Sequence, residues 1–489
     1  MESINKKRIA SFLPYGCVQH FLLAGEHSSR ITYSRKADFR TGIILAVFLC
    51  LTIFQQTHAQ EKDTLALTLK ETLSSALTGN PEILLAKLEI QRTTSQLKAA
   101  KGALLPYISI DGQYLRNIKR PVFFLPPGEG FGGAGGGSEG TIIEAGFDNS
   151  YNISAQANLP LYNRELRTSK RAAETAVEIQ EKGLDINKNQ IRTQVKQAYY
   201  EALLARESLQ VLDQSLENAQ RNFENIQNQF SQELVPEYDM IRAEVQVENI
   251  RPDILQGQNS YEAAVNNLKL LANIPQEIPV SLEESLVEFY ENSDPEVILS
   301  GYTLEDNPEL QQLAVQQNLR KKQIEVQKAA FYPSLSAIGN YAWQAQANNF
   351  NFNNYFWVNT SFIGIQLSIP VFQGLTRVRQ IEQARIDLYQ TNIQEEYQRK
   401  SLSIQAQNAL NRIQRAQRSL EAQEKNIAQA ERGYQIAQVS YNSGVGTLIE
   451  VNDAELALTQ ARLNQLEIIY EYLIALADFN QLTGNETND

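Results

Sequence analysis

Apolar residues return in alternating steps of four and three along the stretch from Ile191 to Phe230. A second stretch with the same spacing begins 211 residues later, runs from Leu402 to Tyr441, and is interrupted only by Gln423. A period of about 3.5 residues over so many turns is typical of helices that pack against other helices as coiled coils. The chain is therefore predicted to contain the same long helix twice. The apolar positions of the first stretch are Ile191, Val195, Ala198, Ala202, Ala205, Leu209, Leu212, Leu216, Ala219, Phe223, Ile226 and Phe230.

Two further helices are predicted from a repeated start signal, Asn-Pro-Glu, at Asn80 and again at Asn307. The asparagine can cap a helix, the proline is preset for the first turn, and the acid faces the positive end of the helix dipole. Each start leads to a proline, Pro106 in the first case and Pro333 in the second, and both pairs are 227 residues apart. The two helices should therefore end in the same way.

After each of these prolines, the pattern changes from a helical period to strict alternation. Residues 363–369 alternate Ile or Leu with Gly, Gln and Ser, and residues 151–159 alternate apolar residues with Asn, Ser and Gln. Residues 108–114 follow the same rule, and residues 334–344 follow it less regularly. Alternation predicts strands with one apolar and one polar face. Four strands of about ten residues, in two hairpins, have the length that crosses a bilayer in a tilted barrel.

These elements predict two repeats of one plan, in which a helix, a β-hairpin, a long helix and a return helix follow one another. Each long helix would extend roughly 100 Å from the strands and project into an aqueous compartment. Repeat 1 comprises residues 60–278, with β-hairpin 105–160, long helix 163–231 and return helix 237–272. Repeat 2 comprises residues 279–489, with linker 279–306, helix 308–332, β-hairpin 334–371, long helix 375–442 and return helix 447–483.

The start of the chain is typical of a secretory leader. Basic residues near Arg35 and Arg40 precede the apolar run 42–54, and signal-peptide cleavage is expected after Ala59. The leader 1–59 contains both cysteines and all three histidines of the chain. The predicted mature chain therefore lacks residues for thiol catalysis, histidine acid–base chemistry or an ordinary zinc site. We expect no catalytic residue, no metal and no cofactor.

The net charge of the chain limits the kinds of molecule that it is expected to bind. Its formal net charge is −12, and removal of the leader leaves it at about −16. An acidic exported chain is a poor candidate for binding nucleic acid, because nucleic-acid affinity depends on neutralising phosphates. Without disulfides in the mature chain, a large buried or oligomeric interface is expected to hold it together.

The two hairpin loops differ from the segments around them. The first, residues 116–149, is rich in glycine, and Gly128, Gly130 and Gly133 satisfy the spacing Gly-x-Gly-x-x-Gly. A dinucleotide site needs a strand before this motif and a helix after it, whereas another alternating segment follows here. The motif therefore favours a flexible surface loop. The second loop carries aromatic residues near Trp357, which suit either an interfacial belt or simple packing within the loop.

Each long helix meets its return helix in a tip. The tips 230–239 and 441–450 align without gaps at an offset of 211 residues. Gly444 and Gly446 suit a tight turn in the second tip, and Pro236 suits the start of the return helix in the first.

The order of these elements and two motifs resemble the TolC-type outer-membrane efflux family. One motif is Leu-Pro-Leu-Tyr at Leu159, with its counterpart Ile-Pro-Val-Phe at Ile369; the other is the second tip, from Tyr441 to Ala454. The resemblance covers roughly residues 62–484. It implies a mixed α and β membrane protein: a homotrimer in which each chain gives four strands to one twelve-stranded β-barrel in outer-membrane lipid. It also implies a coiled-coil tunnel in the periplasm that receives substrates from a periplasmic adaptor protein and an inner-membrane transporter.

A physical constraint favours an oligomer independently of this resemblance. Four strands cannot close a barrel alone, since about eight are the minimum, and open strand edges are not tolerated in lipid. Three copies would supply twelve strands, so the chain is predicted to be an obligate oligomer.

By position, the resemblance places Glu450 and Asp453 at the acidic constriction of the tunnel. They lie three residues apart at the start of a helix, so both should face one side. Three copies would form two rings of carboxylates that favour cations, and the repulsion within them would resist closure. The alternative is that acids in a first helical turn simply complement the helix dipole.

The resemblance also gives Tyr441 a role in holding the closed tip. The arginine that shares this role in the family is replaced here by Gly446. In the first repeat, Asp239 and Arg242 occupy the positions of the acidic pair, so a local pair between them is expected to contribute instead. An ordinary place in the helical seam is the alternative for Tyr441.

Two other classes of protein compete with a channel. An enzyme is disfavoured, because the acidic pair adjoins a helical tip and not a concave pocket. An exported coiled-coil scaffolding or surface protein without a pore would explain the heptads but has no use for the alternating strands. A channel suits small-molecule or metal efflux and protein secretion equally, because the partner pump sets the substrate.

Overall fold

The computed structural model describes residues 65–125, 141–293 and 302–484. The chain divides into two compact units after Glu61, and the described residues belong to the second unit. The expected leader 1–59 and the glycine motif of the first loop lie outside the described residues.

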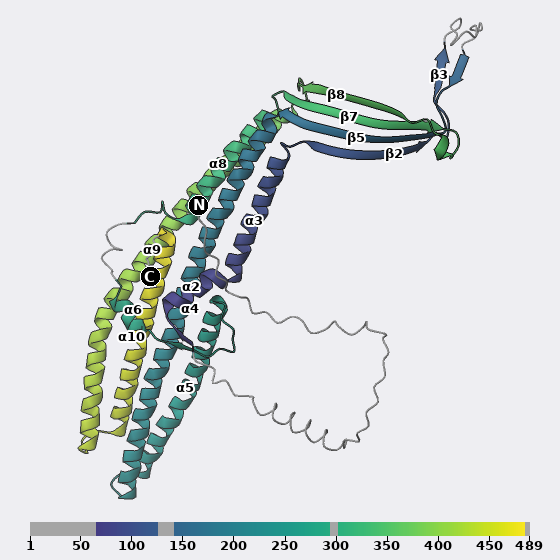
Figure 1. The fold of residues 1–489 in the computed structure, drawn as a ribbon. Coiled ribbons are helices and arrows are strands. Elements are labelled where there is room, and N and C mark those ends of the chain that lie inside the picture. The colour runs from purple at the N-terminus through teal and green to yellow at the C-terminus, as the bar shows by residue number, and fades with distance from the viewer. Residues whose placement is uncertain (1–64, 126–140, 294–301, 485–489) are drawn as a thin grey trace, which may run out of the picture. The chain divides into compact units, whose positions relative to one another are not determined.

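Helices make up most of the described chain (Figure 1). Helix α4 packs along α5 and α9 packs along α10, while α8 contacts α4 and α9, and α10 contacts α4. Helices from the two halves of the sequence therefore share one packed body. None of the described helices carries an apolar stretch long enough to cross a membrane. The helices are α2 (Leu69–Gly79), α3 (Pro81–Gly102), α4 (Arg164–Ser231), α5 (Glu237–Leu271), α6 (Leu286–Glu291), α8 (Pro308–Ala329), α9 (Thr376–Asn442) and α10 (Leu448–Thr483).

The two Asn-Pro-Glu signals begin α3 and α8, and each asparagine has a second task. The side-chain oxygen of Asn80 accepts from the backbone N–H of Glu82, and that of Asn307 accepts from the N–H of Glu309. Their amide groups donate to carbonyls at the ends of the return helices, 3.1 Å from Asn80 to Leu271 and 2.9 Å from Asn307 to Leu482. One buried side chain thus caps one helix and satisfies the last turn of another.

The alternating segments form one antiparallel sheet in the order β2, β5, β7, β8. Pairing of β5 with β7 joins the two expected hairpins. A separate ribbon of β3 and β4 lies within the first loop, because its apolar, strand-forming runs pair with each other. Strand β1 pairs in parallel with β6. The strands are β1 (Leu65–Leu67), β2 (Tyr107–Arg116), β3 (Val122–Leu125), β4 (Thr141–Glu144), β5 (Asn149–Tyr162), β6 (Val280–Leu282), β7 (Ser334–Ala347) and β8 (Val358–Ser368).

The register of the sheet separates apolar from polar residues, as the alternation predicts. We call the first of these surfaces the apolar face, and it is exposed in the single chain, to 94% at Ile363 and 77% at Ile110. Two cross-strand rows of the apolar face are Ile108, Ala157, Gly339 and Ile363, then Ile110, Ala155, Tyr341 and Ser361. Two rows of the opposite face are Ser109, Gln156, Asn340 and Phe362, then Asp111, Ser154, Ala342 and Thr360.

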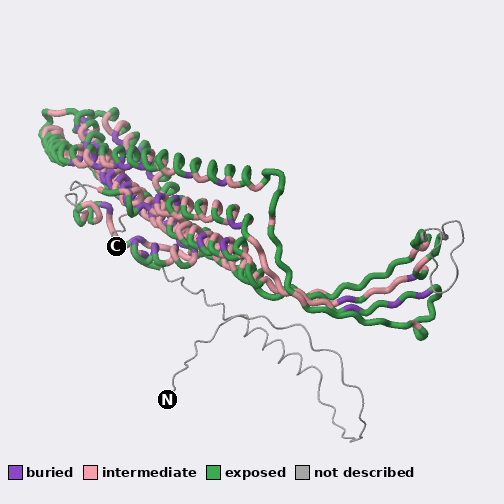
Figure 2. Tube along the Cα trace, turned by 90° about the horizontal axis from the view of Figure 1, so that it is seen from above, coloured by how far each residue is buried: buried purple, intermediate pink, exposed green. Residues whose placement is uncertain are grey.

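Buried residues follow the helical seams, whereas the strands are largely exposed (Figure 2). Most apolar seam positions from Ile191 to Ala202 and from Leu402 to Leu420 are buried in the main core. Beyond Leu420 the seam positions of α9 are only half-buried. These positions can become fully buried only if a protein surface outside the single chain packs against α9 near its tip.

The linker between the two halves is fastened to the middle of α4. The Tyr199 hydroxyl lies 2.7 Å from Oε2 of Glu284, and Arg206 donates to the Glu284 carbonyl at 2.6 Å. The neighbouring Glu207 accepts the backbone N–H of Leu286 at the start of α6. Buried, charge-assisted bonds of this kind are stronger than neutral ones, so the described part of the linker is held firmly on the helical body.

One acid in the helical body is buried without a basic partner. Glu455 of α10 is 3% exposed and faces Ser215 of α4, whose Oγ lies 3.5 Å from a carboxyl oxygen. Burial raises the pKa of Glu455 to about 7, and the Ser215 hydrogen bond opposes this shift only partly. Glu455 also raises the pKa of Tyr434, after the larger effect of that residue's own burial. Packing of α10 against α4 therefore favours the neutral carboxyl.

This raised pKa predicts a pH-dependent stability that Glu455→Gln removes. The folded state holds the Glu455 proton more tightly than the unfolded chain does. The contribution of Glu455 to the free energy of unfolding is therefore most favourable below the ordinary pKa of 4.5 and declines as the pH rises to about 7. Glu455→Gln should therefore stabilise the protein by up to roughly 3 kcal/mol at pH 8 and by much less at pH 4.5, in thermal unfolding of detergent-solubilised protein. The exposed Glu467→Gln on the same helix is the matched control. An equal effect of Glu455→Gln at both pH values would contradict the prediction.

Candidate functional site

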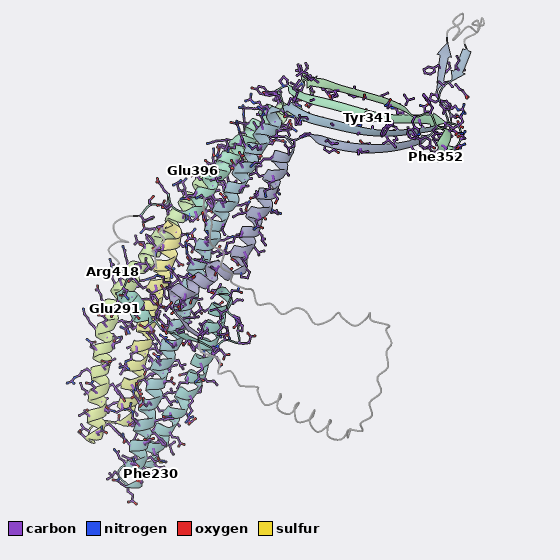
Figure 3. The ribbon with its side chains drawn as sticks, viewed as in Figure 1. Phe230, Glu291, Tyr341, Phe352, Glu396 and Arg418 are labelled. Carbon is purple, nitrogen blue, oxygen red and sulfur yellow. The ribbon has the colours of Figure 1, made fainter. Side chains whose placement is uncertain are left out.

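The two tips are the parts of the helical body where the sequence places its candidate residues. Figure 3 shows Phe230 near the end of α4 that lies away from the sheet. In the second tip, Gly444 adopts φ 73°, and the N–H groups of Val445 and Gly446 both donate to the Ser440 carbonyl at 3.0 Å. The left-handed position of the first tip is held by Glu233, with φ 59°. The aligned tips thus use the same turn, with glycine only in the second.

Gly446, which replaces the family's arginine, sits in a crowded place. A Cβ atom there would lie 3.0 Å from Cβ of Ser440 and 3.1 Å from Oε2 of Glu450. A side chain at this position would require Ser440 or the Glu450 carboxylate to move by a few tenths of an ångström. The aligned position of the first tip holds Val235, so the turn itself does not demand glycine.

Glu450 is engaged within its own helix. Its carboxylate accepts the backbone N–H of Thr447 at 3.0 Å, and its own N–H donates to the Thr447 hydroxyl at 3.4 Å, which forms a capping box. Asp453, one turn later, is exposed and has no hydrogen bond or ion pair in the part of the chain that the structure describes. The structure thus shows the alternative role of Glu450, which is to stabilise the start of its helix. The Asp453 carboxylate has no such partner in the described structure.

Tyr441 joins the two tips through apolar packing. It lies in a cluster with Ile226 of α4, Ala243 of α5 and Leu448 of α10. Its hydroxyl is buried and has no hydrogen-bond partner among the described residues. Burial raises the pKa of Tyr441, and the nearby Asp239 carboxylate raises it further. The structure therefore brings Tyr441 and Asp239 together without a hydrogen bond between them.

The expected pair between Asp239 and Arg242 is not formed within the described structure. Arg242 instead donates to the Tyr238 hydroxyl at 3.1 Å, and its Cζ lies 5.6 Å from the centre of that ring. Tyr238 is four residues earlier on the same helix, which sets the two side chains one above the other. The first tip thus presents an arginine stacked on tyrosine where the second tip presents Asp453.

Sequence reasoning missed Glu455 as a residue of interest. Leu448, Val451, Glu455 and Leu458 follow the heptad spacing of the α10 seam, so an acid at a seam position was a usable signal. All four are buried.

The helical body contains a cavity between its long helices. A cavity of about 550 Å³ lies among α4, α9 and α10, and its lining includes Glu431 and Arg462, which pair with each other at 2.8 Å. Across the described ranges, no three His, Cys, Asp or Glu side chains gather as a metal site would require.

Comparison with known proteins assigns the family. The model of the family described as "Outer membrane efflux protein" matches residues 72–273 and 299–485. Cation efflux system protein CusC of Escherichia coli is 22% identical over 405 residues, which cover 82% of this chain and 83% of CusC. Alkaline protease secretion protein AprF of Pseudomonas aeruginosa is 22% identical over 338 residues, which cover 68% of this chain and 70% of AprF.

A solved structure shares the fold. The CmeC outer membrane channel of Campylobacter jejuni matches with a TM-score of 0.65 at 18% identity, over 85% of each chain. The family match spans both halves of the sequence and confirms the resemblance carried by the repeated motifs. The chain belongs to the outer membrane efflux protein family, and its location is the outer membrane.

Proposed function

We propose that three copies of this chain form one channel that exports substrates across the outer membrane. Each copy gives four strands to a closed twelve-stranded barrel and its helices to a periplasmic tunnel. The tunnel receives substrates from a periplasmic adaptor protein and an inner-membrane transporter. The channel itself performs no chemistry and holds no cofactor.

The pairing register of the four strands is the observation that supports this proposal most directly. The apolar face of the sheet suits lipid and its opposite face suits a water-filled lumen, and each cross-strand row is made mostly of one kind of residue, with exceptions such as Ser361 and Phe362 on β8. Strands β2 and β8 each have one unpaired edge. Because β2 runs away from the helices and β8 runs back toward them, β8 of one copy can pair antiparallel with β2 of the next. A scaffold in water would gain nothing from such a sheet.

An exposed apolar stripe on α9 supports contact between copies. Its side chains recur at helical spacing and are all exposed in the single chain. Isolated apolar residues on a surface are ordinary, whereas a continuous stripe marks an interface. The stripe consists of Ile386, Tyr389, Ile393, Tyr397 and Ile404.

The second tip supplies the proposed constriction. Three copies would bring Asp453 and Glu450 into two acidic rings, of which the Asp453 ring carries the unengaged carboxylates. With Gly446 in place of arginine, the apolar cluster around Tyr441 takes over the task of holding α9 and α10 against α4 and α5.

What the channel exports is set outside the chain. The names of two relatives describe cation efflux and alkaline protease secretion, which are very different cargoes. We infer that this chain, like the shared architecture, imposes no single substrate and that the adaptor and transporter choose it.

Asp453→Asn should lower the cation selectivity of the channel more than Glu450→Gln. Both changes remove one charge per copy, but only Glu450 is held in a capping box, which glutamine can also form. In planar bilayers under a salt gradient, Asp453→Asn should move the reversal potential roughly halfway toward zero. Asp253→Asn, an exposed acid on α5, is the control. Unchanged selectivity in an assembled Asp453→Asn trimer would remove Asp453 from the constriction.

Tyr441→Ala should open the tip, whereas Tyr441→Phe should not. The Tyr441 ring packs between the two tips, so its removal should destabilise the contact between them by about 3 kcal/mol. The hydroxyl makes no hydrogen bond, so phenylalanine keeps the contact and leaves no group unsatisfied. Single-channel recording should show a higher conductance for the alanine variant and a wild-type conductance for the phenylalanine variant. Equal conductance of the two variants would show that packing of the ring does not hold the tip.

A further inference from the structure

A cluster of arginines stacks on aromatic rings where the strands meet the helices. Arg164 and Arg167 come from the start of α4 and Arg377 from the start of α9, and we call these three the arginine corner. The Cζ atom of Arg164 lies 3.9 Å from the centre of the Tyr332 ring, and that of Arg377 lies 5.8 Å from Phe331. Phe331 and Tyr332 are adjacent in sequence and come just after α8. Their contacts with Arg377 and Arg164 therefore link this segment to the starts of both long helices.

The arginine corner borders the apolar face of the sheet. Arg167 stacks 5.6 Å from the centre of the Tyr162 ring, and Tyr162 pairs with Leu335. Leu335 is two residues before Ala337 in β7, so it continues the row of apolar-face residues toward the helices. If the apolar face contacts hydrocarbon, the arginine corner lies where hydrocarbon gives way to headgroups.

Basic residues at this place are unexpected from the helices alone. A helix N-terminus favours negative charge and disfavours a cation. Helix α9 has Arg377 and Arg379 in its first turn, no acid there and no side-chain cap. Arg379 pairs with Glu382 at 2.7 Å, whereas Arg377 has no acidic partner in the described residues. An anion outside the chain would offset this cost.

The guanidinium groups of the arginine corner lack such an anion among the residues that the structure describes. None of the three forms an ion pair with an acid in the described residues. The Nη1 atom of Arg377 is buried and has no hydrogen-bond partner there. A stacked guanidinium keeps its N–H donors in the plane of the group, where they can form paired bonds to phosphate oxygens.

We propose that the arginine corner binds the phosphate of an anionic phospholipid in the inner leaflet of the outer membrane. This inference rests on the proposed barrel, which puts the apolar face in lipid. The rings of Tyr162, Phe331 and Tyr332 are each partly exposed and adjoin the apolar face, so they provide a surface for the glycerol and the first part of the acyl chains. A ligand with a phosphate and an apolar tail fits this surface better than phosphate alone.

The test compares two variants that remove the same charge. R164Q/R167Q/R377Q removes the arginine corner, and R415Q/R418Q/R432Q removes three arginines of α9 farther along the helical body. Figure 3 shows Arg418 well away from the sheet. Native mass spectrometry of detergent-solubilised protein, titrated with phosphatidylglycerol and with phosphatidylcholine, counts chains and bound lipids together. The wild type and the control should prefer phosphatidylglycerol, and the first variant should lose about fivefold of this preference per arginine.

Each outcome decides between distinct explanations. An undiminished preference in R164Q/R167Q/R377Q would overturn the lipid site, and so would displacement of the lipid by an equal concentration of inorganic phosphate. Particles without three chains in the wild type would instead count against the barrel. If the triple variant does not assemble, Arg377→Gln alone should still lose about fivefold, and no loss would overturn the proposal.

Discussion

The structure depends on the two unpaired edges of a four-stranded sheet. In lipid, every backbone N–H and C=O must find a partner within protein, and β2 and β8 each lack one on one side. The antiparallel order of the strands lets the two edges complete each other between copies. In the proposed trimer, closure of the sheet would fix the rest: the apolar face would turn to lipid, the polar face would enclose the lumen, and the long helices would follow from one rim of the barrel.

The tip combines packing and charge in different residues. Tyr441 contributes an aromatic contact with an unused hydroxyl, Glu450 stabilises the start of its helix, and the Asp453 carboxylate is exposed. A side chain at Gly446 would crowd Ser440 and Glu450. Farther from the tip, the buried Glu455 makes the contact between α10 and α4 sensitive to pH. The helical body is thus held mainly by apolar seams, and ion pairs such as that between Glu431 and Arg462 also join α9 to α10.

Local sequence signals predicted those parts of the fold that depend on local physics. The heptad spacing from Ile191 marked buried positions of α4, and Asn80 and Asn307 begin α3 and α8 as capping residues should. The alternation around Ile363 matches the face of the sheet on which that residue lies. These signals are carried by neighbours in the sequence, within one turn of helix or a few residues of strand.

Contacts between distant segments could not be predicted in this way. The pairing of β5 with β7, the second bond of Asn80 to Leu271, and the stacking of Arg164 on Tyr332 join residues far apart in the chain. At the candidate site, the residues were placed by family resemblance. The spacing Thr-x-x-Glu from Thr447 to Glu450 is a capping-box signal that the sequence does carry, whereas the contact of Arg242 with Tyr238 in place of Asp239 depends on side-chain geometry.

The most direct test of a shared barrel is the native mass of the mature protein after detergent extraction from the membrane fraction. Closure of the sheet between copies predicts three chains per particle and no release of the protein without detergent. A monomer or dimer released into aqueous buffer would contradict it, because the edges of β2 and β8 would then be satisfied by water.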